Sequence, residues 1–197
     1  MSGWDAGAMP LSNLLATGGL LLWVAYEVLL RHRTDATATD WQGGDDDRGS
    51  TRLLLGSYAV AGAVTVVFTH IPAGHLSTGR RWIGVALIAV GLAVRAWGMS
   101  TLGRFYTRTL RTTEGQRIVQ EGPYRLIRHP GYCGSLLVWS GYPLGLGNWI
   151  SCVIVTLLLL SAYTWRINAE EKLLLGSFGE QYARYQERTK RLVPFLY

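Results

Sequence analysis

The chain has 197 residues, of which 49% are hydrophobic and only 16% are charged, and its mean hydropathy is +0.16. This composition is too apolar for an ordinary soluble protein of this length, and it favours one integral membrane domain over residues 1–197. The formal net charge of +6 does not indicate a nucleic-acid partner, because the basic residues flank apolar runs. Membrane lipids with anionic headgroups are the expected partner instead.

Five apolar runs follow one another along the chain. They cover residues 11–30, 53–71, 82–100, 132–146 and 149–165. The first three approach the roughly 20 residues that a membrane-crossing helix needs, whereas the last two are shorter. Only Gly147 and Asn148 separate these last two runs, which predicts a tight helical hairpin. We therefore expect an all-α, polytopic membrane protein with about five transmembrane helices.

The basic residues are unevenly distributed between the runs. They gather in segments 31–52 and 101–131 and in the tail after Trp165, whereas the first ten residues contain none. The positive-inside rule therefore predicts that the N-terminus lies outside and the C-terminus in the cytoplasm. We expect an integral protein of the plasma (inner) membrane. Residues 31–52 are rich in Gly and Asp without an apolar period, so we expect a polar cytoplasmic loop there. Arg95, within the third run, is expected to snorkel to the interface.

The last part of the chain predicts a further helix. The helical pattern of the fifth run continues toward Leu175, and Gly176 is expected to interrupt it. Ser177-Phe-Gly-Glu180 then offers a capping box for a new helix. Its aromatic residues, Phe178, Tyr182 and Tyr185, recur at helical spacing, which predicts an amphipathic helix at the cytoplasmic interface.

Two motifs with ionisable residues lie beside the fourth and fifth runs. They are Gly122-Pro-Tyr-Arg-Leu-Ile-Arg-His-Pro-Gly-Tyr132 and Arg166-Ile-Asn-Ala-Glu-Glu171. A charged residue at the centre of a membrane helix costs about 2.5–3.5 kcal/mol on insertion scales, so such a cluster indicates a functional site. Pro130 suits the first turn of a helix, which predicts that a helix begins there with His129 directly before it.

The residue types in the two motifs favour a zwitterionic ligand. Arg166 and Glu170 are four residues apart and share a helix face, where they could also form a plain ion pair worth about 0.2–0.5 kcal/mol. A bound amino-acid group would offer its carboxylate to Arg166 and its ammonium to Glu170. Aromatic rings such as those of Tyr124 and Tyr132 favour a sulfonium cation. Together these preferences suit S-adenosylmethionine.

With Phe178-Gly-Glu-Gln-Tyr-Ala-Arg-Tyr185 behind them, the two motifs resemble the isoprenylcysteine carboxyl methyltransferase family over roughly residues 82–197. The resemblance implies a membrane-embedded methyltransferase that uses S-adenosylmethionine without a Rossmann fold, and the chain has no Gly-x-Gly-x-x-Gly after a predicted strand. It also implies a catalytic region over residues 101–197. This region comprises the loop, the helical hairpin and the C-terminal helix.

The resemblance assigns roles to particular residues. The cofactor-binding positions are Gln116, Arg117, Ile118, Val119, Tyr124, His129, Pro130, Gly131, Tyr132 and Glu170. Arg166 matches the position that faces the carboxylate of the lipid substrate, and Glu171 joins it as a catalytic candidate. Gln116 stands where members that act on prenylated proteins often have histidine. No metal site is expected, because Cys133 and Cys152 lack the spacing of metal ligands.

We therefore predict S-adenosylmethionine-dependent methyl transfer to a lipophilic acceptor, first of all the carboxylate of a prenylcysteine-like or other lipid. A carboxylate is already a nucleophile, whereas an amine or hydroxyl must lose a proton to a base such as Glu171 or His129. One alternative is a phospholipid amine N-methyltransferase. Another is an NADPH-dependent sterol or steroid reductase, a class with a similar Arg-His-Pro-x-Tyr pattern. Three arginines could then bind the 2′-phosphate, namely Arg104, Arg108 and Arg111.

Overall fold

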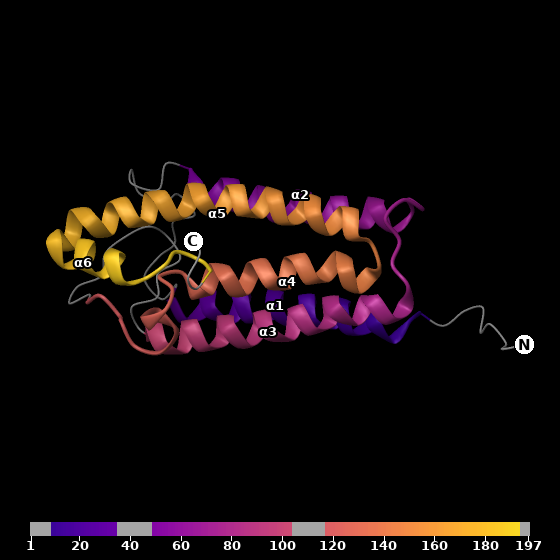
Figure 1. The fold of residues 1–197 in the computed structure, drawn as a ribbon, viewed down its shortest axis with the longest axis horizontal. Helices are drawn as coiled ribbons and strands as arrows, with labels where there is room; N and C mark the ends of the chain where they lie inside the picture. Colours follow the sequence, from indigo (N-terminus) through magenta and orange to yellow (C-terminus); the bar gives the residue numbers. More distant parts are fainter. Residues whose placement is uncertain (1–8, 35–48, 104–116, 194–197) are drawn as a thin grey trace, which may run out of the picture.

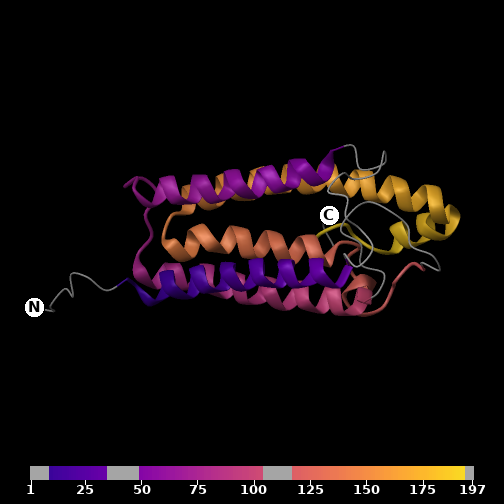
Figure 2. The ribbon, with the colours of Figure 1, turned by 180° about the vertical axis from the view of Figure 1, so that it is seen from behind.

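The computed structural model shows an all-helical protein whose long helices run alternately along one axis (Figures 1 and 2). The structure describes residues 9–34, 49–103 and 117–193. The long helices are α1 (Leu11–Thr34), α2 (Ser50–Thr69), α3 (Thr78–Leu102), α4 (Pro130–Leu146) and α5 (Trp149–Phe178). A 3₁₀ turn, η4 (Gly122–Arg125), precedes α4, and α6 (Glu180–Arg188) follows α5. The predicted all-α fold class is confirmed.

Among the described helices, α1, α2, α3 and α5 are long and apolar enough to cross a membrane. Helix α4 is strongly apolar too, but its 17 residues extend only about 26 Å at 1.5 Å per residue, less than the roughly 30 Å of a bilayer core. The polytopic membrane protein expected from the sequence is confirmed, with four spans by length and α4 running beside them. Helix α4 contacts all four of these helices and is the centre of the bundle.

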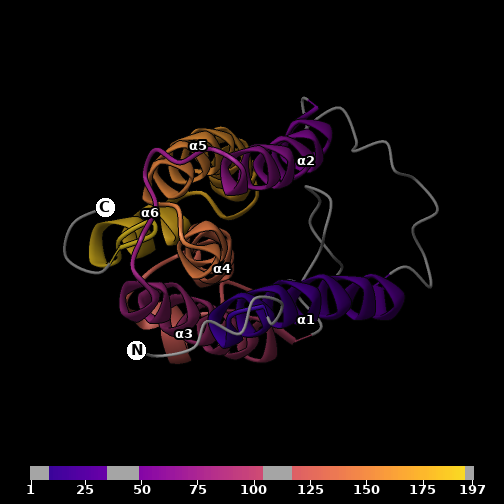
Figure 3. The same ribbon diagram turned by 90° about the vertical axis from the view of Figure 1, so that its right-hand side faces the viewer.

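The helices form two groups when the bundle is viewed end-on (Figure 3). Helices α1, α3 and α4 lie together, and α2 packs along α5 on the other side of α4. An aromatic cluster joins the groups, since Trp139 of α4 stacks on Tyr58 of α2 at 5.1 Å and meets Trp23 of α1 edge-on at 5.6 Å. The hydroxyl of Tyr58 is hydrogen-bonded to that of Tyr163 on α5 at 3.0 Å.

Helices α3 and α4 approach closely through glycines that face each other. Gly84 and Gly91 on α3 are seven residues apart, as are Gly134 and Gly141 on α4. A Cβ atom on Gly91 would lie 2.6 Å from the carbonyl oxygen of Gly134, and one on Gly84 would lie 2.5 Å from that of Gly141. Only glycine allows membrane helices to pack this closely. The contact sets the register of α4, whose first turn carries the motif residues.

The predicted hairpin between α4 and α5 is confirmed. Gly147 ends α4 in the left-handed conformation, with φ of 98°, which glycine adopts without strain. Asn148 then caps α5 by accepting from the backbone N–H of Ser151 at 2.9 Å. Its side-chain amide donates to the carbonyl oxygens of Phe68 and Ala73 at 3.1 and 2.9 Å, which ties the hairpin to the end of α2.

Two predicted boundaries are wrong. Helix α5 continues through Gly176 to Phe178, because one glycine costs a helix only about 1 kcal/mol. The hydroxyl of Ser177 donates to a carbonyl oxygen within α5 at 3.0 Å and does not cap α6, so the predicted capping box is absent. Gly179, with φ of 52°, separates the two helices instead.

The predicted loop at 31–52 is shorter than expected at both ends. Helix α1 extends to Thr34 and α2 already begins at Ser50. Residues 35–48 lie outside the described part of the chain, so the cytoplasmic placement of this loop stays a prediction.

Candidate functional site

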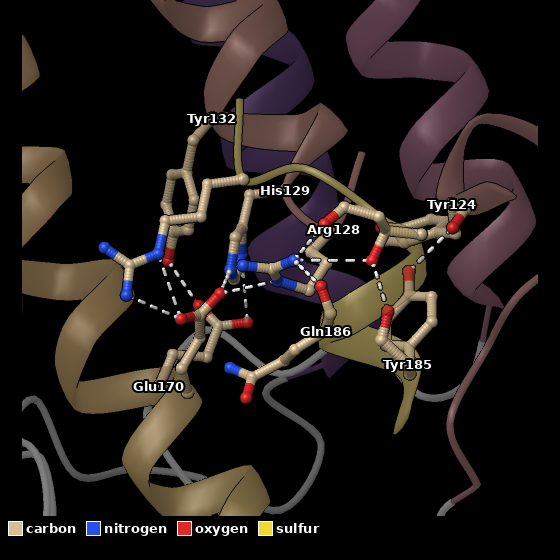
Figure 4. A network of polar contacts seen from close by, with 10 residues as sticks. Tyr124, Arg128, His129, Tyr132, Glu170, Tyr185 and Gln186 are labelled. Carbon is tan, nitrogen blue, oxygen red and sulfur yellow. Dashed lines mark hydrogen bonds and ion pairs between the residues drawn. The ribbon is translucent and has the colours of Figure 1, made fainter. Parts of the chain in front are cut away.

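The two motifs meet at one end of the bundle, where the first turn of α4, the last turns of α5 and helix α6 come together (Figure 4). Pro130 begins α4 as predicted, so His129 lies directly before the helix. Both His129 and Arg166 are buried. Burial of ionisable groups requires polar partners, because an unpaired buried charge is strongly unfavourable.

Tyr132 joins Arg166 and Glu170 at the centre of the site. Its hydroxyl donates to Oε2 of Glu170 at 3.0 Å and accepts from Nε of Arg166 at 3.2 Å. Nη1 of Arg166 also donates to Oγ1 of Thr51 on α2 at 2.9 Å. The structure therefore places a cationic and an anionic group on either side of one aromatic hydroxyl. This is the arrangement that a zwitterionic ligand requires.

Glu171 has a different environment from Glu170. Its Oε1 lies 2.7 Å from Nε of Arg128 and 3.2 Å from Nε2 of His129, and its Oε2 lies 2.9 Å from Nη2 of Arg191. Nε of Arg191 also donates to Oε2 at 3.1 Å, so each oxygen has two nitrogen neighbours. A carboxylate offers about four acceptor positions, and these are occupied. The predicted catalytic role of Glu171 stays a prediction.

A C-terminal segment pairs with the loop that carries the first motif. The backbone N–H of Arg128 donates to the carbonyl oxygen of Lys190 at 2.7 Å, and that of His129 donates to Arg191 at 3.1 Å. The N–H of Lys190 returns a bond to Leu126 at 3.1 Å. This short parallel pairing holds the loop against the end of α5. It brings Arg191 to Glu171, a contact that the sequence analysis missed.

The guanidinium of Arg128 links this loop to the end of α6. Its Nη1 donates to the carbonyl oxygen of Gln186 at 3.1 Å and to that of Thr189 (Figure 4). The hydroxyl of Thr189 also lies within hydrogen-bonding distance, at 3.4 Å. One buried guanidinium therefore contacts both the Glu171 carboxylate and the carbonyl oxygens at the C-terminal end of α6, where a cation is favoured.

Helix α6 is amphipathic as predicted, but its tyrosine face is buried against the protein. Tyr182 and Tyr185 are both buried, and the Tyr185 hydroxyl donates to the carbonyl oxygen of Tyr124 at 2.7 Å (Figure 4). Burial raises the pKa of Tyr185, so its hydroxyl stays a donor. Phe178, which was assigned to the same helix, ends α5 instead.

The four predicted cofactor residues at positions 116–119 differ in what the structure shows of them. Gln116 falls outside the described residues. Arg117 is exposed and pairs with Glu121 at 3.2 Å, whereas Val119 is buried. Ile118 is half-buried. Their contact with a cofactor stays a prediction that rests on the family resemblance.

A buried ion pair beside the site was missed. Arg95 is only 7% exposed and pairs with Glu27 of α1, so the expected snorkelling is wrong. Its Nη1 donates to the carbonyl oxygen of Gly131 at 2.8 Å, and its guanidinium lies 5.9 Å from the ring of Trp23. The signal was present, because Glu27 and Arg95 are the one acidic and the one basic residue of their respective apolar runs, and such residues pair inside membranes.

The fold and the site define a polytopic helical membrane protein with a buried polar centre at one end of the bundle. The eukaryotic intramembrane Ras methyltransferase ICMT has the same fold, with a TM-score of 0.68 at 23% sequence identity. The match covers 97% of this chain and 70% of that one. A family model described as phospholipid methyltransferase matches residues 79–181. The chain belongs to this family.

Sequence relatives confirm the predicted resemblance to isoprenylcysteine methyltransferases. The protein-S-isoprenylcysteine O-methyltransferase A of Arabidopsis thaliana is 37% identical over 116 residues, which cover 57% of this chain and 58% of that protein. A probable rice enzyme of the same name is 32% identical over 117 residues, covering 58% and 61%. The cobalt-zinc-cadmium resistance protein CzcN of Cupriavidus metallidurans is 30% identical over 155 residues, covering 76% and 68%. The chain spans about 60% of the length of the plant relatives.

Proposed function

We propose that this protein transfers a methyl group from S-adenosylmethionine to the carboxylate of a lipophilic acceptor, of which a prenylcysteine-like lipid is the first choice. The observation that carries the proposal is the Tyr132 hydroxyl between Nε of Arg166 and Oε2 of Glu170. It gives one anion-binding and one cation-binding group at the same site. The names of the plant relatives, which are O-methyltransferases, support the same reaction.

The residues at the site fit S-adenosylmethionine. Glu170 is 31% exposed at its side chain, so it has room for the cofactor's ammonium group. The ring of Tyr132 lies 5.7 Å from that of His129 and 5.3 Å from that of Tyr163, and aromatic faces favour a sulfonium cation. When bound, the cofactor supplies a methyl group activated by a positively charged sulfur. The first-turn residues Pro130 and Gly131 belong to this proposed site.

Arg166 is proposed to hold the acceptor's carboxylate in line with the methyl group. A guanidinium presents a planar pair of donors that matches a carboxylate. Tyr132 and Thr51 hold Arg166 on two sides, which limits the positions that its guanidinium can adopt. The burial of Arg166 excludes water from the acceptor. Catalysis of this kind consists of alignment and desolvation, which need no proton transfer.

Glu171 is proposed to hold the site together in place of removing a proton. Through Arg128 and His129 it fixes the residues that lead into α4, and through Arg191 it fixes the C-terminal segment. An amine acceptor would need a base, and the Glu171 carboxylate, whose two oxygens already contact Arg128, His129 and Arg191, is poorly placed to serve as one. A carboxylate acceptor is therefore favoured.

Phospholipid amine methylation is the second candidate, because the matching family is described as phospholipid methyltransferase. The reductase alternative depends on Arg104, Arg108 and Arg111, which lie outside the described residues. We further propose that the site faces the cytoplasm at the plasma membrane, with the N-terminus outside. The start of α1 and the site lie at opposite ends of the bundle (Figure 1), as this topology requires.

The test uses the full-length protein purified in detergent. Calorimetry should detect binding of S-adenosylhomocysteine and no binding of NADPH, and the reverse result would show a reductase. Methyl-tritiated S-adenosylmethionine is then supplied together with membrane lipid extract or with a synthetic farnesylcysteine analogue. A carboxyl methyl ester releases its label in mild base, whereas an N-methyl group retains it. Label that resists base would refute the carboxylate acceptor and support the phospholipid amine.

A further inference from the structure

Arg95 of α3 contacts the first turn of α4 from inside the bundle. Its side chain is 8% exposed and pairs with Glu27 of α1 through Nε. A second nitrogen of the same guanidinium, Nη1, donates to the carbonyl oxygen of Gly131 at 2.8 Å. A charged side chain within an apolar helix is expensive to retain, so its presence indicates a function. The reaction proposed above gives Arg95 no role.

Glycines allow Arg95 to lie this close to α4. A Cβ atom on Gly134 would lie 2.7 Å from the backbone nitrogen of Arg95, and one on Gly131 would lie 3.3 Å from its Nη1. A carbonyl oxygen has two lone pairs, so Gly131 can accept from Arg95 and still accept a bond within its own helix. A hydrogen bond is directional, whereas close packing of glycines is not. The bond from Arg95 therefore orients the first turn of α4.

The carbonyl group that Arg95 holds is next to the centre of the candidate site. Gly131 is followed by Tyr132, whose hydroxyl lies 3.2 Å from Nε of Arg166 and 3.0 Å from Oε2 of Glu170. Hydrogen bonds weaken steeply when their geometry changes. A small displacement of the first turn of α4 would therefore disturb both contacts of the Tyr132 hydroxyl.

Helix α1 holds the same part of α4 through a second contact. Nε1 of Trp23 donates to Oγ of Ser135 at 3.0 Å, one turn after Gly131. The ring of Trp23 also lies 5.9 Å from the guanidinium of Arg95. Trp23 and Glu27 are four residues apart and share one face of α1. Helix α1 therefore holds two consecutive turns of α4, one directly through Trp23 and one through the ion pair of Glu27 with Arg95.

We propose that Arg95 is a positioning residue for the cofactor site. Glu27 fixes its guanidinium, which holds the Gly131 carbonyl and so places the first turn of α4, with Tyr132, for the cofactor. This inference deepens the proposed function and rests on the proposed use of S-adenosylmethionine. Loss of the contact with Gly131 should therefore weaken cofactor binding even when the helices remain packed.

The test removes the contact with Gly131 in two different ways. In Glu27→Gln/Arg95→Gln the side chain at position 95 ends where Nε was, so the two amides can pair between α1 and α3 but cannot reach Gly131. Glu27→Leu/Arg95→Met replaces the ion pair with apolar side chains. Calorimetry should show an affinity for S-adenosylhomocysteine about tenfold below that of wild type in each variant that folds, which is the effect of one lost hydrogen bond. Wild-type affinity in either folded variant would overturn the role of Arg95.

Val155→Ala is the matched control for a loss of stability. Val155 is fully buried in α5, eleven residues before Arg166, which is about 16 Å along the helix. The truncation should lower the melting temperature and leave the affinity for S-adenosylhomocysteine unchanged. A tenfold loss of affinity in Val155→Ala would show that destabilisation alone weakens binding, and it would overturn the inference.

A double-mutant cycle shows whether Arg95 acts through the first turn of α4. Tyr132→Phe removes the hydroxyl that the turn places, so it should lower the affinity less in the Glu27→Gln/Arg95→Gln background than in wild type. Two losses that simply multiply would overturn this mechanism. Absence of S-adenosylhomocysteine binding by the wild-type protein would overturn the proposed cofactor and this inference with it. Wild-type binding with unchanged affinity in the variants would overturn the role of Arg95 alone.

Discussion

Replacing Glu171 with glutamine should destabilise the protein more than any substitution of an exposed glutamate. The change keeps the size of the side chain but removes the charge that Arg128 and Arg191 share. Arg128 is 8% exposed at its side chain, whereas Arg191 is 30% exposed. Arg191 can recover hydration when its partner is lost, and Arg128 cannot. Most of the cost therefore comes from Arg128.

The magnitude follows from the cost of an uncompensated buried charge. Removing one partner of a buried ion pair costs about 3–5 kcal/mol. Glutamine still accepts one hydrogen bond and Arg128 keeps the carbonyl oxygens of Gln186 and Thr189, so the lower end applies. We expect a loss of about 3 kcal/mol in the free energy of unfolding for Glu171→Gln. By the same reasoning, Arg128→Gln should cost more than Arg191→Gln.

The assay is a dodecyl sulfate titration of the detergent-solubilised protein, followed by far-ultraviolet circular dichroism. Glu121→Gln is the matched control, because Glu121 forms an exposed pair with Arg117 at 3.2 Å, and such pairs contribute at most about 1 kcal/mol. If Glu171→Gln unfolds at the same detergent fraction as Glu121→Gln, the carboxylate is not the electrostatic centre described above. Equal costs for Arg128→Gln and Arg191→Gln would refute the argument from exposure.

Four further predictions concern the ligands and the helices. Glu170→Gln should lower the affinity for S-adenosylhomocysteine at least tenfold, since a bond to a charged group is worth about 1.5–3 kcal/mol, and unchanged calorimetric affinity would contradict the ammonium contact. Arg166→Lys should reduce methyl transfer while S-adenosylhomocysteine still binds, because lysine lacks the planar pair of donors; full turnover would argue against a carboxylate acceptor. Gly91→Leu should prevent folding, because a Cβ atom there would lie 2.6 Å from the carbonyl oxygen of Gly134, and gel filtration should then recover no folded protein. Gly62→Leu is the control and should be tolerated, since nothing lies within 4 Å of its Cβ position. Glu27→Leu should destabilise the protein by about 3–5 kcal/mol in the dodecyl sulfate titration, because it leaves Arg95 without its ion-pair partner. Adding Arg95→Met should recover part of that loss. A double variant less stable than Glu27→Leu would contradict the role of the ion pair.

Local rules were enough to predict the helices and the hairpin. The length of the apolar runs, Pro130 at a first turn and the Gly147-Asn148 pair all act within a few residues of one another. A helix satisfies its own backbone hydrogen bonds over four residues, so this information lies in adjacent sequence. The same periodicity placed Arg166 and Glu170 on one face. The family resemblance predicted Tyr132 as a cofactor-binding residue. The structure places its hydroxyl between the side chains of Arg166 and Glu170.

The partners of the buried charges required the tertiary structure. Glu171 meets Arg128 across 43 positions of the chain and Arg191 across 20, and Arg95 meets Glu27 across 68. The sequence analysis singled out Arg128, Glu171 and Arg95 but neither Glu27 nor Arg191, because the partners depend on which helices become neighbours. Arg95 is buried and does not snorkel because the close packing of α3 on α4 and α1 brings Glu27 and the Gly131 carbonyl to it.

The same distinction separates Glu170 from Glu171, which are adjacent in the sequence and about 100° apart on the helix. Adjacent residues of a helix therefore face different directions. That Glu170 meets Tyr132 and stays partly open, while Glu171 is closed in by two arginines, depends on the C-terminal segment that pairs with the loop before α4. The sequence determined which side chains could take part in the site. Packing between distant segments determined which of them stay available to a ligand, because a charge in a membrane protein binds the partner that the fold brings within reach.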